Sequence, residues 1–137
     1  MVAHRGLEVI QYFKNNAVTW LSVNASNVIA FTGAATFSSS VTGTAFYESS
    51  SIKKKNVFAR HSSPDGIDIV GFTWKPEFKI DNKKHIGVIA QEVEKVLPDA
   101  VEGEDEVSKR VNYTEVLLYK IQLLENRINK LEKLLNK

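Results

Sequence analysis

The feature that most constrains the fold is a regular spacing of apolar residues in the last quarter of the sequence. Leucine or isoleucine recurs at steps of four, three, four, three and four residues, at Leu117, Ile121, Leu124, Ile128, Leu131 and Leu135. This spacing places the side chains on one face of an α-helix and is typical of a coiled coil. We therefore predict a single amphipathic helix from Tyr113 to Lys137, with these residues in an interface between copies of the chain.

Two interpretations of this helix are open, because it could pack on its own domain or associate with copies of itself. The coiled coil is favoured, since nothing after the helix in the sequence could cover its apolar face. Isoleucine at a positions with leucine at d positions favours two strands. However, Leu118 and Leu134 widen the apolar face, so the pattern leaves the number of strands open.

Charged residues are distributed very unevenly along the chain. Residues 1–48 hold four of them, and residues 49–137 hold the other thirty. Residues 15–47 are rich in Val, Ile, Thr, Phe, Ser, Asn and Gly, a mixture that predicts short strands and turns. They could form a β-hairpin unit of a globular domain. We favour a segment of a fibrous β-structure, in which strands from identical neighbouring chains complete the sheets. A segment this short can hardly bury the faces of its own strands.

Composition excludes several classes of function. A net charge of +2 gives no basis for binding nucleic acid or an anionic membrane. Cysteine is absent, which excludes disulfides, thiolate zinc sites and a cysteine nucleophile. The histidines have no ligand spacing, so we expect no metal. No stretch approaches the ~18 apolar residues that a membrane-spanning helix needs.

Residues 49–137 predict an α+β fold. Residues 66–80 alternate as a strand that places Phe72 and Trp74 on one side, after a turn at residues 64–66. Residues 85–97 pass from an apolar strand into a helix that Pro98 stops. The core of this part is expected at Trp74, Ile86, Val88, Ile89 and Val93.

Three serines at 49–51 and three lysines at 53–55 mark the boundary between the part of the chain with few charged residues and the part with many. A serine hydroxyl is a weak nucleophile at neutral pH and needs a positioned base. A lysine can be that base only if burial or neighbouring cations lower its pKa, and consecutive lysines repel one another. The alternative interpretation is an exposed basic loop with solvated lysines.

The order of these features resembles the C-terminal intramolecular chaperone domain of phage tailspikes, tail fibres and neck appendages, a self-cleaving Ser/Lys peptidase family. The strongest likeness is the block GVIAQEV at residues 87–93, followed by Val96, Leu97 and Pro98. The motif FTWK at residues 72–75 precedes this block, and the motif VNY at residues 111–113 follows it. The likeness covers residues 45–137. It implies a homotrimer in which residues 1–48 end a β-rich fibre stalk, residues 49–137 form the auto-processing domain, and residues 112–137 form its coiled-coil helix.

The resemblance further implies a catalytic serine and lysine five residues apart, with a cut before the serine. Two registers fit. Ser50 with Lys55 places the cut at the Ser49–Ser50 bond, and the preceding sequence FYES favours this register. Ser49 with Lys54 places the cut at the Glu48–Ser49 bond and aligns the following Asn-Val better. In both registers the aspartate that follows the family's serine is replaced here by serine.

The function implied is a trimerisation chaperone that helps a phage fibre or appendage to fold and is then released by autoproteolysis. Its partners would be its own copies and the upstream stalk. Folding and cleavage would take place in the host cytoplasm, and after assembly the protein would be located in the virion's tail fibre or appendage. Some neck appendages are thought to bind ATP, but no phosphate-binding glycine loop is present, so we expect no cofactor. The main alternative is an uncut trimeric structural or receptor-binding tip; a membrane-tethered regulator is disfavoured.

Overall fold

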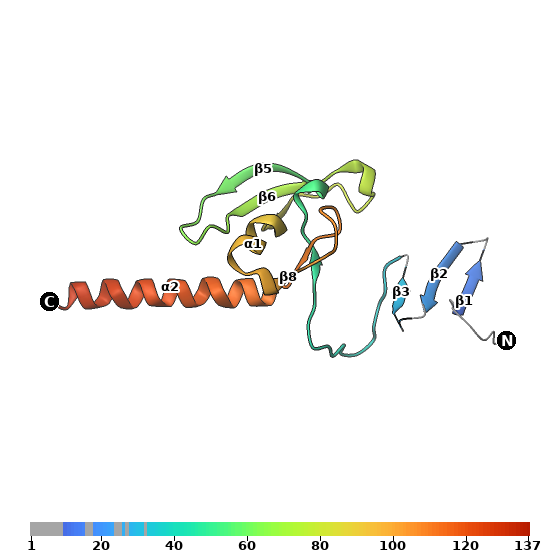
Figure 1. The fold of residues 1–137 in the computed structure, drawn as a ribbon, viewed down its shortest axis with the longest axis horizontal. Helices are drawn as coiled ribbons and strands as arrows, with labels where there is room; N and C mark the ends of the chain where they lie inside the picture. The colour runs from blue at the N-terminus through green and yellow to red at the C-terminus, as the bar shows by residue number, and fades with distance from the viewer. Residues whose placement is uncertain (1–9, 16–17, 24–25, 27, 32) are drawn as a thin grey trace. The chain divides into compact units, whose positions relative to one another are not determined.

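The protein is described from a computed structural model, which covers residues 10–15, 18–23, 26, 28–31 and 33–137. The chain divides into two compact units, Met1–Thr42 and Gly43–Lys137. The described residues form three antiparallel sheets of three strands each and two α-helices (Figure 1). The predicted α+β class is therefore confirmed.

The first unit contains one sheet with the strand order β1-β2-β3. Its strands are β1 (Ile10–Asn15), β2 (Val18–Val23) and β3 (Ile29–Phe31). Both pairs are antiparallel, and strands that are neighbours in the sheet are also consecutive in the sequence. The side chains of Ile29 and Phe31 are more than half exposed. This sheet thus leaves apolar surface uncovered within one chain.

Residues 33–47 contain no helix or strand, so the short strands predicted there are not formed within a single chain. The side chains of Phe37, Val41 and Phe46 are all more than half exposed. Apolar side chains in an extended segment without strand partners gain little from burial in a single chain. The sequence composition therefore predicts strands that one copy of the chain does not form by itself.

The second unit contains two small sheets. The first has the order β4-β9-β8, with β4 (Glu48–Ser49), β9 (Arg110–Val111) and β8 (Val101–Glu102). The second has the order β5-β6-β7, with β5 (Lys55–His61), β6 (Ile69–Trp74) and β7 (His85–Gly87). The predicted turn at residues 64–66 lies between β5 and β6, where Gly66 has a φ of 84° that favours glycine.

Two groups of buried apolar residues form the core of this unit. The larger consists of Ile67, Val88, Ala90, Val93, Ala100, Val111 and Val116. The smaller consists of Val70, Phe72 and Ile89, against which Ile52, Val57 and Trp74 pack. Helix α1 (Ala90–Val96) contributes to the larger group and ends before Pro98, as the sequence predicts.

The expected core is correct at Val88, Ile89 and Val93, and Trp74 packs against it half-buried. It is wrong at Ile86, whose side chain is 82% exposed. Successive residues of a strand point to opposite faces of the sheet. In β7, His85 stacks on Phe72 and Gly87 is buried, so Ile86 must point outward.

We expect Val93→Ala to lower the free energy of unfolding by about 2 kcal/mol, because it removes two buried carbon groups and leaves a small void. Val93 is fully buried, whereas Val107 is 42% exposed. The same replacement at Val107 should therefore have little effect. Chemical denaturation of both variants measures the difference, and equal losses would contradict the assignment of Val93 to the core.

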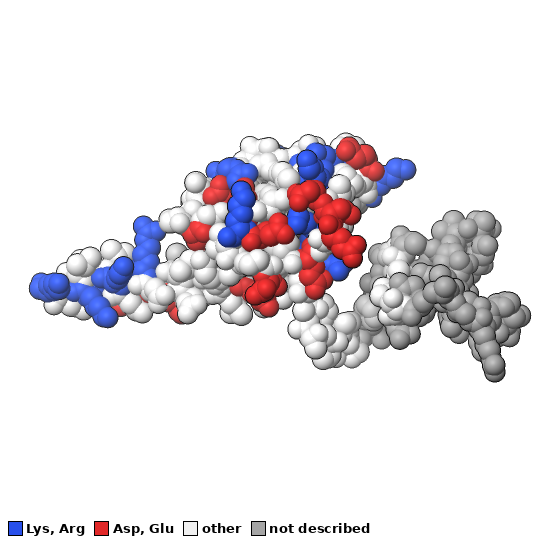
Figure 2. All heavy atoms as spheres, viewed as in Figure 1, with Lys and Arg blue, Asp and Glu red and all other residues white. Residues whose placement is uncertain are grey.

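Helix α2 (Tyr113–Leu135) confirms the predicted C-terminal helix. The Asn112 side chain caps its N-terminus by accepting a hydrogen bond from the Glu115 amide at 3.3 Å. Only its first turns pack on the unit, and the rest extends past the two sheets (Figure 1). A largely uncharged surface follows the helix, and basic side chains gather toward its C-terminal end (Figure 2).

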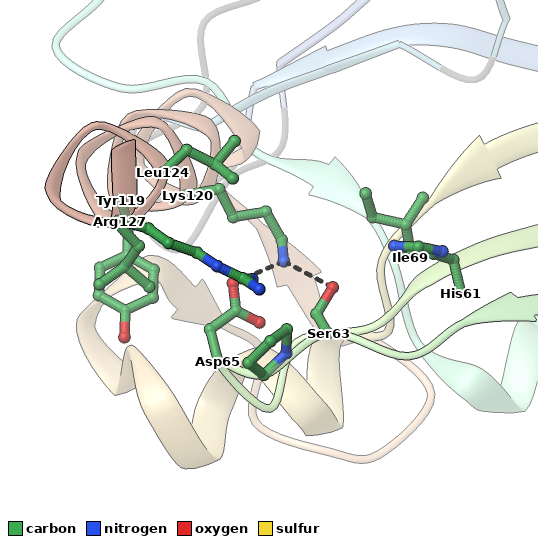
Figure 3. A pocket seen from close by; sticks show the side chains of 10 residues that line it. His61, Ser63, Asp65, Ile69, Tyr119, Lys120, Leu124 and Arg127 are labelled. Atoms are coloured by element: carbon green, nitrogen blue, oxygen red, sulfur yellow. Dashed lines mark hydrogen bonds and ion pairs between the residues drawn. The ribbon is translucent and has the colours of Figure 1, made fainter. Parts of the chain in front are cut away.

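Lys120 joins α2 to the turn between β5 and β6. Its Nζ lies 2.8 Å from Asp65 Oδ2 and 2.6 Å from the Ile67 carbonyl oxygen, and it also reaches Ser63 (Figure 3). A cavity of about 650 Å³ lies beside these contacts, lined in part by His61, Ile69, Tyr119, Leu124 and Arg127. Within the described part of the chain, no helix is both long enough and apolar enough to cross a membrane.

Candidate active site

Ser50 directly follows β4, and its side chain is fully buried. Its backbone is held from two sides, because its N–H donates to the Lys109 carbonyl at 3.1 Å and its own carbonyl accepts from the Ala90 N–H at 2.9 Å. These bonds connect Ser50 to the segment before β9 and to the first residue of α1. The peptide bond before Ser50 therefore lies in a fixed backbone segment.

A short helical turn brings Lys55 back to this serine. The 3-10 helix η1 (Ile52–Lys54) lies between them, and Lys55 begins β5. Lys55 Nζ lies 2.9 Å from Ser50 Oγ and 2.8 Å from the Val88 carbonyl oxygen. The five-residue spacing in the sequence thus becomes a direct contact between a hydroxyl and an amine.

The surroundings of Lys55 favour its neutral form. The residue is only 3% exposed, and burial lowers its pKa from 10.5 to about 8, against the opposing attraction of Glu48. The ring centroids of Phe72 and Trp74 lie 4.1 and 5.5 Å from Nζ. These rings, which the sequence pattern places on one side of β6, form an apolar wall around the amine. Lys55 can therefore act as a base near neutral pH.

The alternative register also forms a contact. Lys54 Nζ lies 3.1 Å from Ser49 Oγ, and both residues are partly exposed. Ser50 and Lys55, in contrast, are both buried. Burial removes the hydration that stabilises an ammonium ion. The geometry therefore favours Ser50 with Lys55 over Ser49 with Lys54.

Two further groups contact Ser50 and were not predicted from the sequence. Ser50 Oγ donates to the Val88 carbonyl at 2.7 Å, and the Tyr113 hydroxyl lies 3.1 Å from Ser50 Oγ. Tyr113 also accepts the Val88 N–H at 3.2 Å. Both residues lie within motifs that the resemblance identified, yet nothing in their spacing indicates that they meet Ser50.

Ser51, which follows Ser50, is also fully buried. Its Oγ accepts the Lys53 N–H at 3.0 Å and so caps η1. The same hydroxyl donates to the Glu106 carbonyl and accepts from Gln91 Nε2 at 3.2 Å. An aspartate could provide the two accepting contacts but, when ionised, not the donated one. The hydroxyl thus caps η1, the turn that lies between Ser50 and Lys55.

Gln91 and Glu92, in the most family-like block, have supporting roles. Gln91 Oε1 accepts the Ile52 N–H at 3.0 Å, which fixes the start of η1. Glu92 Oε1 pairs with Arg60 at 2.6 Å and so joins α1 to β5. Among the described residues, no group of three or more histidine or carboxylate side chains could hold a metal ion.

The chain was compared with known proteins in three ways. Searches of curated proteins and of solved structures found no match. Residues 63–102 match the model of a family described as chaperone of endosialidase. The matched segment contains Phe72, Trp74 and the block at residues 87–93, and it ends before Tyr113. The match confirms the predicted resemblance, and over residues 63–102 this chain carries the sequence pattern of Peptidase_S74, the chaperone of endosialidase.

Proposed function

We propose that this chain is a trimerisation chaperone that ends a phage fibre or appendage protein and releases itself by cutting the Ser49–Ser50 bond. The observation that carries the proposal is the buried contact between Ser50 and Lys55 within the second unit, where the charged part of the sequence begins. The family name is that of a peptidase and its description is that of a chaperone, and both agree with this role.

The reaction needs only groups of the chain and one water molecule. Lys55 Nζ takes the proton of Ser50 Oγ, and the oxygen attacks the carbonyl carbon of Ser49. The C–N bond then breaks, the Ser50 nitrogen receives the proton from Lys55, and an ester joins Ser49 to the Ser50 oxygen. Water hydrolyses this ester and returns the proton to Ser50 Oγ. The reaction occurs once per chain and needs neither metal nor cofactor.

The backbone around the scissile bond suits this sequence. The Ser50 nitrogen, which becomes the leaving amine, donates to the Lys109 carbonyl at 3.1 Å. A carbonyl in this place stabilises the positive charge that develops on the nitrogen as it receives a proton. Because nucleophile and scissile bond belong to the same chain, no binding pocket for a separate substrate is required.

Self-association is supported by the exposed seam of α2. Each of its six predicted interface residues is at least half exposed in the single chain: Leu117, Ile121, Leu124, Ile128, Leu131 and Leu135. Since most of them are already about half buried, covering the rest of each side chain would stabilise an assembly by about 1 kcal/mol per residue. A trimer, as the family resemblance implies, would cover this seam and bring three stalk segments together.

A trimeric helix in this position has a physical use. Strands that pair between chains face a large entropic cost of encounter. Joining three chains at one end converts that encounter into a search at high effective concentration. The exposed apolar side chains of residues 28–46 are then the surface that neighbouring stalk segments would cover. Cutting afterwards leaves the stalk stable by its slow unfolding rate.

A second candidate function is an uncut trimeric fibre tip. It is favoured by one observation, the serine at position 51 where the family pattern has aspartate. In that case α2 would clamp the fibre permanently, and Ser50 and Lys55 would be a buried structural pair. The two functions differ in whether a chain incubated alone remains in one piece.

The test compares Ser50→Ala with Ser49→Ala. We expect the wild-type chain and Ser49→Ala to yield two bands on a denaturing gel, and Ser50→Ala to remain intact because its nucleophile is gone. The rate should be first order and independent of protein concentration once trimers exist. Loss of cleavage in Ser49→Ala with full cleavage in Ser50→Ala would assign the reaction to the other register.

A further inference from the structure

The hydroxyl of Tyr113 contacts two groups at the centre of the site. It lies 3.1 Å from Ser50 Oγ and accepts the Val88 N–H at 3.2 Å. Tyr113 is the first residue of α2, and the preceding Asn112 caps the helix and donates its own N–H to the Ala100 carbonyl at 2.9 Å. The start of the helix is therefore anchored, and the phenol is held against the serine.

The hydrogen-bond partners determine which way the phenol proton points. The Val88 N–H can only donate, so it occupies a lone pair of the Tyr113 oxygen. The proton of the phenol is then free to be directed at Ser50 Oγ. Ser50 in turn directs its own proton to the Val88 carbonyl, 2.7 Å away. This arrangement satisfies every polar group around the serine.

Gly87 provides the space for this arrangement. A Cβ atom at Gly87 would lie 2.6 Å from the Tyr113 hydroxyl oxygen and 3.1 Å from a ring carbon of Phe72. Distances below 3.0 Å require an atom to move, so a larger residue here would force the Tyr113 hydroxyl or the backbone of β7 to shift. The glycine is thus matched to the position of the phenol.

We propose that Tyr113 is a third catalytic residue, whose O–H donates a hydrogen bond to Ser50 Oγ and stabilises the negative charge that forms as Lys55 takes the serine proton. This inference rests on the proposed autoproteolysis. When Ser50 loses its proton it can no longer donate to Val88, and its oxygen needs other donors in a buried site. Tyr113 and the newly protonated Lys55 provide them. The phenol keeps its own proton throughout, so the atom balance of the reaction is unchanged.

The test is Tyr113→Phe in the full chain, with Tyr119→Phe as the matched control. Both variants lose one phenol oxygen from the same helix, but Tyr119 lines the cavity beside Lys120 (Figure 3). We expect Tyr113→Phe to slow cleavage by about tenfold to a hundredfold, because a hydrogen bond to a developing charge is lost. Tyr119→Phe should cleave at the wild-type rate. The pH at which the rate is half-maximal should stay that of the wild type in both.

The possible outcomes separate this inference from the function on which it rests. If the wild-type chain does not cleave, the proposed function fails. If the wild-type chain and folded Tyr113→Phe cleave equally fast, the function stands and Tyr113 has no catalytic role. If the circular dichroism spectrum shows that Tyr113→Phe does not fold, a chain with 3-fluorotyrosine at position 113 is tested in its place. The fluorinated phenol is more acidic and is therefore a stronger hydrogen-bond donor. Faster cleavage then supports the inference, and an unchanged rate overturns it.

Discussion

Raising the pH from 6 to 9 is expected to increase the rate of cleavage about a hundredfold, with half of the maximal rate near pH 8. The reason is that Lys55 must be neutral to accept the serine proton, and burial lowers its pKa to about 8. Below this value the neutral fraction of Lys55 falls about tenfold for each pH unit. Single-turnover cleavage, followed by intact mass in buffers from pH 6 to 9, measures the profile.

Lys55→Met and Lys54→Met form the matched pair of variants for this profile. Lys55→Met should not cleave at any of these pH values, whereas Lys54→Met should retain both the rate and the midpoint of the wild type. A profile that disappears with Lys54→Met would contradict the assignment of the base. A flat profile in the wild type would exclude a titrating lysine from the rate-limiting step.

The same pKa shift links the charge of Lys55 to stability. Between pH 8 and 10.5 the unfolded chain holds this proton and the folded chain does not. Because the unfolded state then binds more protons, the contribution of Lys55 to the free energy of unfolding increases with pH across this window. Lys55→Met should lack this contribution. The free energy of unfolding of the wild type should therefore rise relative to that of Lys55→Met as the pH increases.

The second large effect is expected from the double replacement Ile121→Asp with Ile128→Asp, which should convert the proposed trimer into monomers. Both side chains are about half exposed in the single chain and lie at a positions of the seam. An aspartate buried there without a partner costs several kcal/mol, and three copies would place like charges together at each level. Sedimentation velocity should give the mass of one chain for the variant and of three chains for the wild type.

A matched control places the same charges on the other side of the helix. Asn126 and Asn129 lie outside the seam, and Asn126→Asp with Asn129→Asp adds two negative charges without burying them. This control should remain trimeric. If the seam variant and the control sediment alike as trimers, α2 does not hold the assembly, and the surface that does must lie elsewhere in the chain.

Helix α2 shows what could be predicted from the sequence. Its apolar residues repeat over a long segment, and its boundaries follow from a local pattern that one chain carries by itself. The position of Phe72 and Trp74 on one side of β6 follows equally from the period of two. The contact of Ser50 with Lys55 was also within reach, because only five residues separate them and one short helical turn joins them.

The remaining features depend on contacts between distant segments. Tyr113 lies 63 residues from Ser50, and the Val88 carbonyl comes from a third segment, so no local pattern places them together. The choice between the two serine–lysine registers depends on burial, which the rest of the fold decides. Ile86 was misplaced because the apolar Val88 and Ile89 follow it closely in the sequence, while the direction of a side chain in β7 depends on how that strand pairs with β6.

The central claim is that Ser50, with Lys55 as its base, cuts the bond on its own N-terminal side. The most direct test is the intact mass of the C-terminal fragment after the wild-type chain has been incubated at pH 9. We predict a fragment of residues 50–137, which begins at Ser50. A fragment that begins at Ser49 would assign the reaction to the partly exposed pair Ser49 and Lys54. A chain that stays whole would contradict autoproteolysis and favour the uncut trimeric fibre tip.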